Sequence, residues 1–299
     1  MMLKGKNLAP VHFKAAVIIF KGTGLVRSNE SVWKMKKYQN LQKLLKDMGR
    51  VMIAYSGGVD STLLLKAAKD ALGENVVAVT ALSATTPEIE RRDAVRLARS
   101  IGVAHILLES NELKMADFTK NPLDKCYICK NHRFGALIDL ARKKNIDHVL
   151  DGANLDDHKD FRPGMQATRE LGVRSPLSEV RLTKAEIRRI SKKLRLPTWD
   201  KPSLACLASR IPYGQPITAE KLKQVDAAEN YIRKLGLSKA VRVRHEGDTA
   251  RIELAAQDIA KAVVPEVRKR LIAYFKKLGF KHIALDLSGY RMGSLNPTK

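Results

Sequence analysis

The sequence predicts an α/β fold, a doubly wound parallel sheet followed by a smaller C-terminal α+β domain. Short apolar runs alternate with helical patterns from residue 50 onward, which is typical of βαβ units. Beyond residue 217 the order changes to a helix, a hairpin and two further elements. We therefore expect a basic leader at 1–34 that is disordered or a mispredicted start, a nucleotide-binding domain at 35–200, and a substrate domain at 201–299.

The elements of the first domain have individual signals. Thr86 is expected to be the N-cap of a helix with Pro87 at its first position, which ends at Gly102. Apolar runs predict strands at 51–55, 75–82, 103–108 and 148–150, and leucine spacing predicts helices at 41–48 and 62–69.

The following segments extend the pattern toward the C-terminus. Thr183 and Glu186 form a capping-box pattern that opens a helix ending before Pro197. The proline-rich segment 197–217 is expected to be a loop. The predicted elements after it are a helix at 218–236, a hairpin of 241–245 with 251–254, and two further elements at 265–278 and 282–287.

Composition limits the class of protein. Of the 299 residues, 44% are hydrophobic and 29% charged, as in globular proteins. No apolar run approaches the ~18 residues of a membrane span, so we expect a cytoplasmic protein that does not enter membranes. The net charge of +24 suits RNA or an anionic nucleotide, or is simply a solvated basic surface. Aromatic residues make up only 5%, so we do not expect nucleic-acid binding.

A polar, glycine-rich loop at 56–61, Ser-Gly-Gly-Val-Asp-Ser, joins the first predicted strand to the next helix. Its backbone N–H groups and hydroxyls lie at the positive end of a helix, which favours a phosphate or pyrophosphate. The Gly-Lys-Ser/Thr ending of a Walker A loop is absent. An ordinary glycine-rich βα turn is the alternative interpretation. A second glycine-bearing loop follows the strand at 148–150, at the same end of a parallel sheet.

Three cysteines, Cys126, Cys129 and Cys206, are the only ones in the chain. The CxxC pair is expected at the start of a helix, where thiolates are favoured. Three thiolates leave one position open, which suits a [4Fe–4S] cluster with one accessible iron or a zinc site with an exogenous ligand. A redox pair, a zinc site completed by His132, and unrelated buried thiols are the alternatives.

The loop at 56–61 resembles the PP-loop of the ATP pyrophosphatase family, whose fold is of the adenine nucleotide alpha hydrolase-like type. The resemblance implies that the loop holds the phosphates of ATP, with Asp60 at a Mg²⁺ ion, while an oxygen of the substrate takes AMP and pyrophosphate leaves. The candidate ATP-binding residues are Ser56, Gly57, Gly58, Val59, Asp60, Ser61, Gly152 and Asn154.

The stretch from Trp199 to Gly214, around Cys206, resembles the signature of the LarE family of ATP-dependent sulfur transferases. The resemblance runs from residue 35 to the C-terminus and includes the CxxC pair and the segments 151–157 and 241–245. It implies that pyridinium-3,5-biscarboxylic acid mononucleotide is adenylated and converted to its thiocarboxylate. That product is the precursor of the nickel-pincer cofactor of lactate racemase.

The resemblance also implies that Cys206 is the sulfur centre. In single-cysteine members this residue gives up its own sulfur and becomes dehydroalanine. Members with the additional CxxC are implied to hold a [4Fe–4S] cluster on three cysteines, here Cys126, Cys129 and Cys206, and to use a cluster-bound sulfide. We favour the cluster-dependent version for this chain.

Charge suggests the remaining roles. The substrate carries a phosphate and two carboxylates, so guanidinium groups suit it. The candidates are Arg210, Arg242 and Arg244. Arg242 and Arg244 alternate on one face of a strand, so both can reach the same anion. We also expect Arg210 to be catalytic, together with Cys206 and Asp60. Ion pairs are the alternative for each arginine. The two adjacent carboxylates Asp156 and Asp157 are expected to orient magnesium or the nucleotide.

The expected partners are the small nucleotide substrate, sulfide or a sulfur-donor protein, cofactor-maturation enzymes, and further copies of the chain in a homo-oligomer. Two rival functions remain. A tRNA thiolation enzyme with a [4Fe–4S] cluster accords with the positive charge, although the chain has no cysteine-rich zinc element. A nucleotide-binding regulator or cluster carrier would leave the adenylation apparatus unused.

Overall fold

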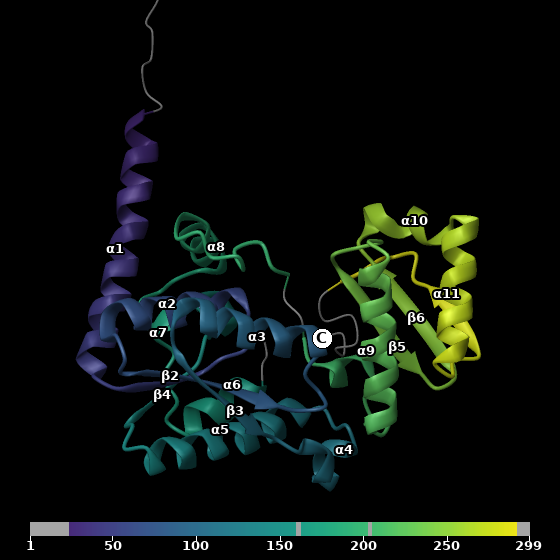
Figure 1. The fold of residues 1–299 in the computed structure, drawn as a ribbon, viewed down its shortest axis with the longest axis horizontal. Coiled ribbons are helices and arrows are strands. Elements are labelled where there is room, and N and C mark those ends of the chain that lie inside the picture. Colours follow the sequence, from purple (N-terminus) through teal and green to yellow (C-terminus); the bar gives the residue numbers. More distant parts are fainter. Residues whose placement is uncertain (1–23, 160–162, 203–204, 292–299) are drawn as a thin grey trace, which may run out of the picture.

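The computed structural model describes residues 24–159, 163–202 and 205–291 (Figure 1). Helix α1, Gly24–Met48, is longer than the helix predicted at 41–48. It begins inside the segment that we expected to be a leader, and the remainder of that segment, residues 1–23, lies outside the described residues.

The first sheet is parallel and four-stranded, in the order β3-β2-β1-β4. Val51 at the start of β1 is paired with Val76 on one side and with His148 on the other. The predicted α/β architecture is therefore confirmed. The strands are β1 Val51–Ala54, β2 Val76–Leu82, β3 Ala104–Glu109 and β4 His148–Leu150.

Helices cover both faces of this sheet (Figure 1). One face packs against α1, α2, α3, α7 and α8 through buried side chains such as Leu45, Leu63 and Ile187, and the other face packs mainly against α5 through Phe134 and Leu137. The helices of this domain are α2 Val59–Leu72, α3 Glu88–Ile101, α4 Ala116–Thr119, α5 Lys125–Lys143, α6 Pro163–Glu170, α7 Pro176–Glu179 and α8 Lys184–Lys193, with short 3₁₀ turns at Glu112–Lys114 (η1) and Leu155–Lys159 (η2).

Of the helix caps predicted in this domain, two are confirmed and one is wrong. Thr183 and Glu186 form the capping box at the start of α8, and the left-handed Gly102 ends α3. Thr86, however, is not the N-cap of α3. Pro87 occupies that position with an extended backbone (ψ 139°), so the helix begins one residue later than predicted.

The second sheet has the order β5-β6-β7, with β5 and β6 antiparallel and β7 parallel to β6. Helices α9 and α11 pack on one face of this sheet through residues such as Ile232 and Phe275. Along β5 and β6, Arg242, Arg244 and Glu253 alternate with the apolar strand residues that belong to the same core. The elements are η3 Leu207–Arg210, α9 Ala219–Lys234, β5 Val241–Glu246, β6 Thr249–Leu254, η4 Ala256–Asp258, α10 Ile259–Val263, α11 Pro265–Lys277 and β7 His282–Leu285.

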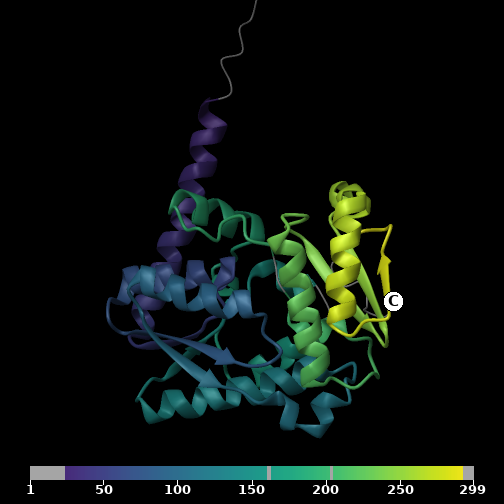
Figure 2. The ribbon, with the colours of Figure 1, turned by 45° about the vertical axis from the view of Figure 1, so that its right-hand side comes forward.

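The two halves meet through α9 and the loop around η3 (Figures 1 and 2). Phe118 of α4 belongs to the same buried cluster as Leu207 of η3 and Val225 of α9. Asn121, fully buried and with a positive φ of 59°, donates from Nδ2 to the carbonyls of residues 211, 212 and 215. These contacts fix the segment that follows Cys206 against the first domain.

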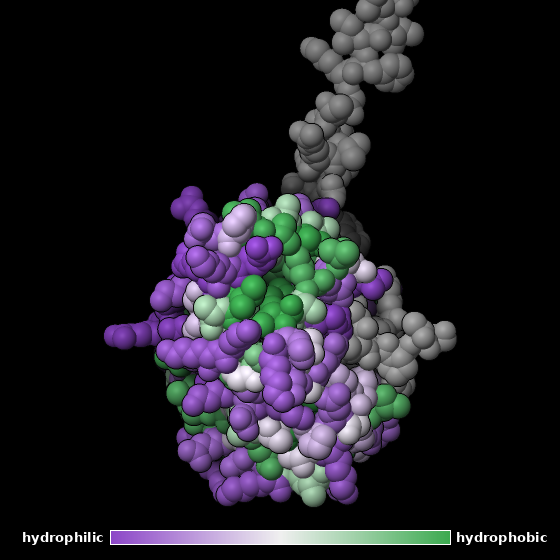
Figure 3. Space-filling model, turned by 90° about the vertical axis from the view of Figure 1, so that its right-hand side faces the viewer, coloured by the Kyte–Doolittle hydropathy of each residue, from purple (hydrophilic) through white to green (hydrophobic). Residues whose placement is uncertain are grey.

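The face seen in Figure 3 is largely hydrophilic, with a hydrophobic patch near its centre. Val263 and Val264, at the junction of α10 and α11, are among the exposed apolar side chains. Among the helices of the described ranges, none has the length and apolarity needed to cross a membrane.

Candidate functional site

The glycine-rich loop turns sharply between β1 and α2. Gly57 has a positive φ of 70°, and a Cβ atom there would approach the backbone of Ala94 in α3 to 3.1 Å. The hydroxyls of Ser56 and Ser61 lie 3.1 Å apart, and the Gly58 N–H donates to Ser56 Oγ at 3.3 Å. The loop therefore places two hydroxyls at the N-terminus of a 14-residue helix, where a phosphate is favoured.

The second glycine-bearing loop, which follows β4, lies directly against the first. A Cβ atom on Gly152 would lie 3.0 Å from the Ser61 backbone nitrogen, so a larger residue would require the two loops to move apart by a few tenths of an ångström. Asn154 Nδ2 donates to Asp60 Oδ1 at 3.5 Å. The two loops that the sequence placed at the ends of strands thus form one surface.

Asp60, in the first turn of α2, is partly buried beside a lysine that the sequence analysis missed. Its carboxylate forms an ion pair with Lys184 at the start of α8. Burial raises the pKa of the Asp60 carboxyl above its usual range, and the Lys184 ammonium opposes this shift. The sequence did hold a signal for Lys184. It follows the capping-box Thr183, and this placed it at the N-terminus of the next helix.

The adjacent acids at the start of η2 have different surroundings. Asp157 lines the cavity and accepts a hydrogen bond from the Asn154 backbone at 2.9 Å. Asp156 accepts from the Lys184 backbone N–H at 2.9 Å, which joins η2 to the first turn of α8. Of the two predicted acids, only Asp157 lies on the wall of the cavity.

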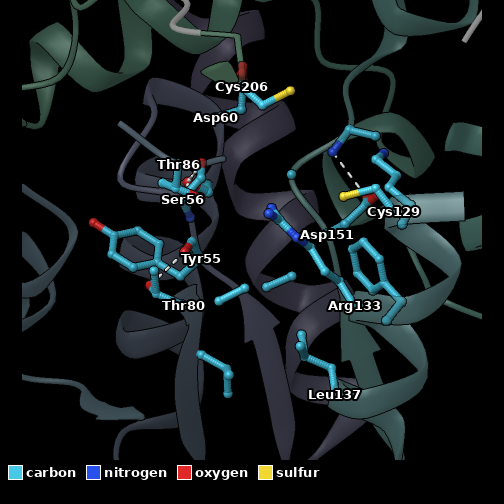
Figure 4. A pocket seen from close by; sticks show the side chains of 18 of the residues that line it. Tyr55, Ser56, Asp60, Thr80, Thr86, Cys129, Arg133, Leu137, Asp151 and Cys206 are labelled. Carbon is cyan, nitrogen blue, oxygen red and sulfur yellow. Dashed lines mark hydrogen bonds between the residues drawn. The ribbon is translucent and has the colours of Figure 1, made fainter. Parts of the chain in front are cut away.

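A cavity of about 400 Å³ opens in front of the glycine-rich loop (Figure 4). It is enclosed by the carboxyl ends of β1, β2 and β4, by the first turn of α3, and by the side of α5 that carries Cys129 and Arg133. Its wall includes Ser56, Asp60, Ser61, Thr80, Thr86, Glu90, Cys129, Lys130, Arg133, Asp151, Gly152, Asp157, Met165 and Cys206.

Two of the three cysteines line this cavity, Cys129 from α5 and Cys206 from the loop before η3, and both direct their sulfur atoms into it (Figure 4). Cys126, one turn before Cys129, is exposed, and its thiol interacts electrostatically with that of Cys206. The CxxC pair lies at the start of a helix, as predicted.

The expected thiolates are not favoured by these surroundings. Partial loss of surrounding water raises the pKa of the thiol of the exposed Cys126, and burial raises the pKa of the Cys129 thiol to about 12 against the effect of Arg133. In the ranges that the structure describes, no group of three or more Cys, His, Asp or Glu side chains is arranged to hold a metal ion.

Arg210, at the end of η3, is fully buried. Its guanidinium forms a two-point pair with Glu229 of α9, with distances of 2.8 Å (Nε–Oε1) and 3.1 Å (Nη2–Oε2), and both side chains are 0% exposed. Its Nη1 donates to the Cys206 carbonyl at 2.8 Å and also to the carbonyl of Ala205. The structure thus places Arg210 behind the Cys206 backbone and outside the cavity wall.

Arg242 and Arg244 are also buried. Arg244 is paired with Glu253 at 2.9 and 2.8 Å and donates to the Ser209 carbonyl at 2.8 Å. Arg242 donates to the Tyr290 hydroxyl at 3.2 Å and stacks on that ring. Burial, followed by the nearby Arg210, lowers the pKa of Arg242. The two share a strand face as predicted, although neither lines the cavity.

Several charged groups on the cavity wall were not predicted, among them Arg133 and Glu90. Arg133 follows Cys129 by one helical turn on α5, a spacing that was available as a signal. Glu90 lies in the first turn of α3, and its carboxylate takes part in none of the side-chain hydrogen bonds among the described residues. Burial raises the pKa of the Glu90 carboxyl to about 7, against the effect of Lys201, Arg210 and other cations across the domain boundary.

Comparison with known proteins agrees with this geometry. The NAD synthase family model matches residues 35–132, which include the glycine-rich loop and the CxxC pair. The pyridinium-3,5-bisthiocarboxylic acid mononucleotide synthase of Lactiplantibacillus plantarum is 39% identical over 88% of this chain and 94% of its own length. An uncharacterised protein of Synechocystis is 46% identical over 87% of this chain and 97% of its own length.

A weaker similarity is limited to part of the chain. The tRNA-specific 2-thiouridylase of Thermus thermophilus is 29% identical over 52% of this chain and 53% of its own length.

Proposed function

Because the chain belongs to the family of pyridinium-3,5-bisthiocarboxylic acid mononucleotide synthases, within the PP-loop ATP pyrophosphatases, we propose that it converts the carboxylates of pyridinium-3,5-biscarboxylic acid mononucleotide to thiocarboxylates. The chain is thus an ATP-dependent sulfur-transferring enzyme. We further propose that its product is destined for a nickel-pincer cofactor, as in lactate racemase maturation.

The reaction has two steps. A substrate carboxylate oxygen attacks the α-phosphorus of ATP, pyrophosphate leaves, and an acyl-adenylate forms. A sulfur nucleophile then attacks the acyl carbon, and AMP leaves with the oxygen that bonded it, so that one oxygen of the carboxylate is replaced by sulfur. The first step needs a phosphate site and the second needs a sulfur group at the same carbon.

The observation that carries the proposal is that candidate groups for both steps line one cavity. Ser56 and Ser61 line it on the side of the phosphate-binding loop, and Cys129 and Cys206 line it on the sulfur side. We assign ATP phosphates to the 56–61 loop and to the adjoining Gly152 and Asn154. A Mg²⁺ ion would be held by Asp60, whose carboxylate lies on the cavity wall together with Asp157, and would neutralise phosphate charge.

The test is an assay with ATP, Mg²⁺, sulfide and the biscarboxylated nucleotide, read by mass spectrometry. The expected product gains one sulfur-for-oxygen exchange per carboxyl and releases one AMP and one pyrophosphate for each exchange. An ATP analogue with a methylene bridge between the α and β phosphates is the control and should give no product. Thiolated tRNA in place of a thiolated nucleotide would overturn the proposal.

We also propose that Cys126, Cys129 and Cys206 hold a [4Fe–4S] cluster that supplies the sulfur. Two soft thiol donors on the cavity wall, with Cys126 one helical turn before Cys129, support this by their chemistry, whereas the described side chains do not form a three-ligand group. We therefore assign the chain's residues no step through the cluster. Arg210 would act as a positioning residue, because it fixes the Cys206 carbonyl.

Anaerobic reconstitution with iron and sulfide, followed by absorption spectroscopy, tests the cluster. The wild-type protein should bind four irons per chain, and Cys206→Ala should weaken binding. Ser100→Ala, in the last turn of α3 and outside the cavity wall, is the control and should not. If Cys206 is instead consumed, the intact protein after turnover loses the mass of one hydrogen sulfide, and the cluster proposal fails.

The wider setting is also proposed. We propose that the chain works in the cytoplasm as a homo-oligomer and receives sulfide or a sulfur-donor protein. Three free cysteines among the described residues accord with a reducing compartment.

A further inference from the structure

Arg133 is held at the wall of the cavity by groups to which the reaction above assigns no role. Its Nε donates to the Glu112 carboxylate, and its Nη2 donates to Thr85 Oγ1 at 2.7 Å. Glu112 is 1% exposed and also accepts hydrogen bonds from Ser83 and Ser110. The buried edge of the guanidinium is therefore fixed before any ligand binds.

The outer edge of the same guanidinium faces the cavity. Within the part of the chain that the structure describes, Nη1 of Arg133 has no hydrogen-bond partner. The side chain is 21% exposed, and Figure 4 shows it reaching from α5 into the cavity between Ser56 and Cys129. The N–H groups of Nη1 are thus available to an acceptor on a bound molecule.

The other charged side chains on the wall are mostly carboxylates, which repel an anion. Asp60 is paired with Lys184, and Asp151 accepts a hydrogen bond from Ser175 at 2.6 Å. Lys130 is a second cation on the wall, but the hydrogen bonds of the described residues do not fix its ammonium. A guanidinium that is already oriented loses less conformational entropy when it binds a planar acceptor.

We infer that Arg133 recognises a carboxylate of the substrate and makes the enzyme select the diacid over its diamide. This rests on the proposed function. A carboxylate only accepts hydrogen bonds and carries the opposite charge, whereas a carboxamide is neutral and turns donors toward the guanidinium as often as its oxygen. A charge-assisted hydrogen bond contributes about 1.5–3 kcal/mol, which corresponds to a preference of about 10- to 100-fold.

Calorimetric binding without ATP tests this without turnover. Pyridinium-3,5-biscarboxylic acid mononucleotide is compared with the same nucleotide carrying two carboxamides. Wild-type protein should bind the diacid at least about 10-fold more tightly. Arg133→Met should lose most of that preference while its affinity for the diamide stays within about twofold. Arg142→Met, at an exposed position of the same helix (77% exposed), should behave like the wild type.

Arg133→Met leaves the Glu112 carboxylate buried without its cation and can destabilise the protein. A second variant controls for this effect. The double variant Glu112→Gln/Arg133→Gln removes both charges and should show the same loss of preference. An unchanged preference, or an equal loss of affinity for both ligands, overturns the inference and leaves the proposed function intact. A wild-type protein that binds neither nucleotide overturns both.

Discussion

Replacing Arg210 by methionine should separate the two steps of the reaction while lowering stability. Arg210 pairs with Glu229 at two points, and both side chains are fully buried. Burial alone would raise the pKa of Glu229, but Arg210 holds it below its usual range. The substitution therefore leaves a carboxylate in the interior with less compensation.

The size of the effect follows from what remains. Removing one partner of a buried pair costs about 3–5 kcal/mol. Glu229 keeps Arg233 at 2.7 Å and the Val243 N–H at 3.2 Å, so we expect the lower end, about 3 kcal/mol. Adding Glu229→Gln to Arg210→Met removes the buried charge and should recover about 1–2 kcal/mol.

The assay combines urea unfolding with two readouts of activity. Pyrophosphate release should persist, since Arg210 does not line the cavity, whereas thiocarboxylate formation should fall at least about 10-fold because the Cys206 carbonyl loses a hydrogen bond. Arg233→Met, which removes the other cation of Glu229 but no contact to Cys206, is the matched control and should keep both steps. A stability loss below about 1 kcal/mol, or parallel loss of both steps, would refute the reasoning.

Three further predictions concern other parts of the site. Because burial raises the folded-state pKa of Glu90 from 4.5 to about 7, the folded protein binds this proton more tightly than the unfolded chain, and stability falls as pH rises through that range. Glu90→Gln should thus be more stable than wild type above pH 7, by at most about 3 kcal/mol, with the difference vanishing below pH 4.5 in urea unfolding. Gly152→Ala should push on the Ser61 backbone and weaken ATP binding about 10-fold by calorimetry, whereas Gly135→Ala, where a Cβ has nothing within 4 Å, should not; equal effects would contradict the close contact. Asn121→Gly, which removes three hydrogen bonds across the domain boundary without adding backbone strain, should cost about 2–3 kcal/mol in unfolding and speed proteolysis of the following loop; an unchanged cleavage rate would show that the clamp is not needed.

The sequence was most informative where chain connectivity alone decides position. In a parallel sheet, the loops that follow β1 and β4 must emerge at one edge, and the structure brings Gly152 against Ser61 there. The CxxC pair was equally accessible, because a helix start places residues three apart on one side. Such features depend on neighbours in the sequence or on a known sheet topology.

Side chains whose partners lie across the fold were harder to predict. Helical spacing places Arg133 on the face of Cys129, yet only the fold shows that Glu112 fixes one edge of its guanidinium. The predicted N-cap of α3 was wrong for a local reason. A Thr-Pro-Glu sequence allows either Thr86 or Pro87 to be the N-cap, and the extended Pro87 takes that place.

Arg210 shows where chemistry alone leaves two answers. A guanidinium that suits a substrate carboxylate suits a buried protein carboxylate equally well, so residue type cannot choose between them. Glu229 decides the matter in the structure. It lies on another element, α9, whose docking against η3 depends on an apolar cluster that includes Leu207 and Val225. Because the same arginine holds the Cys206 carbonyl, its burial still bears on the reaction, through the position of the sulfur and not through the substrate's charge.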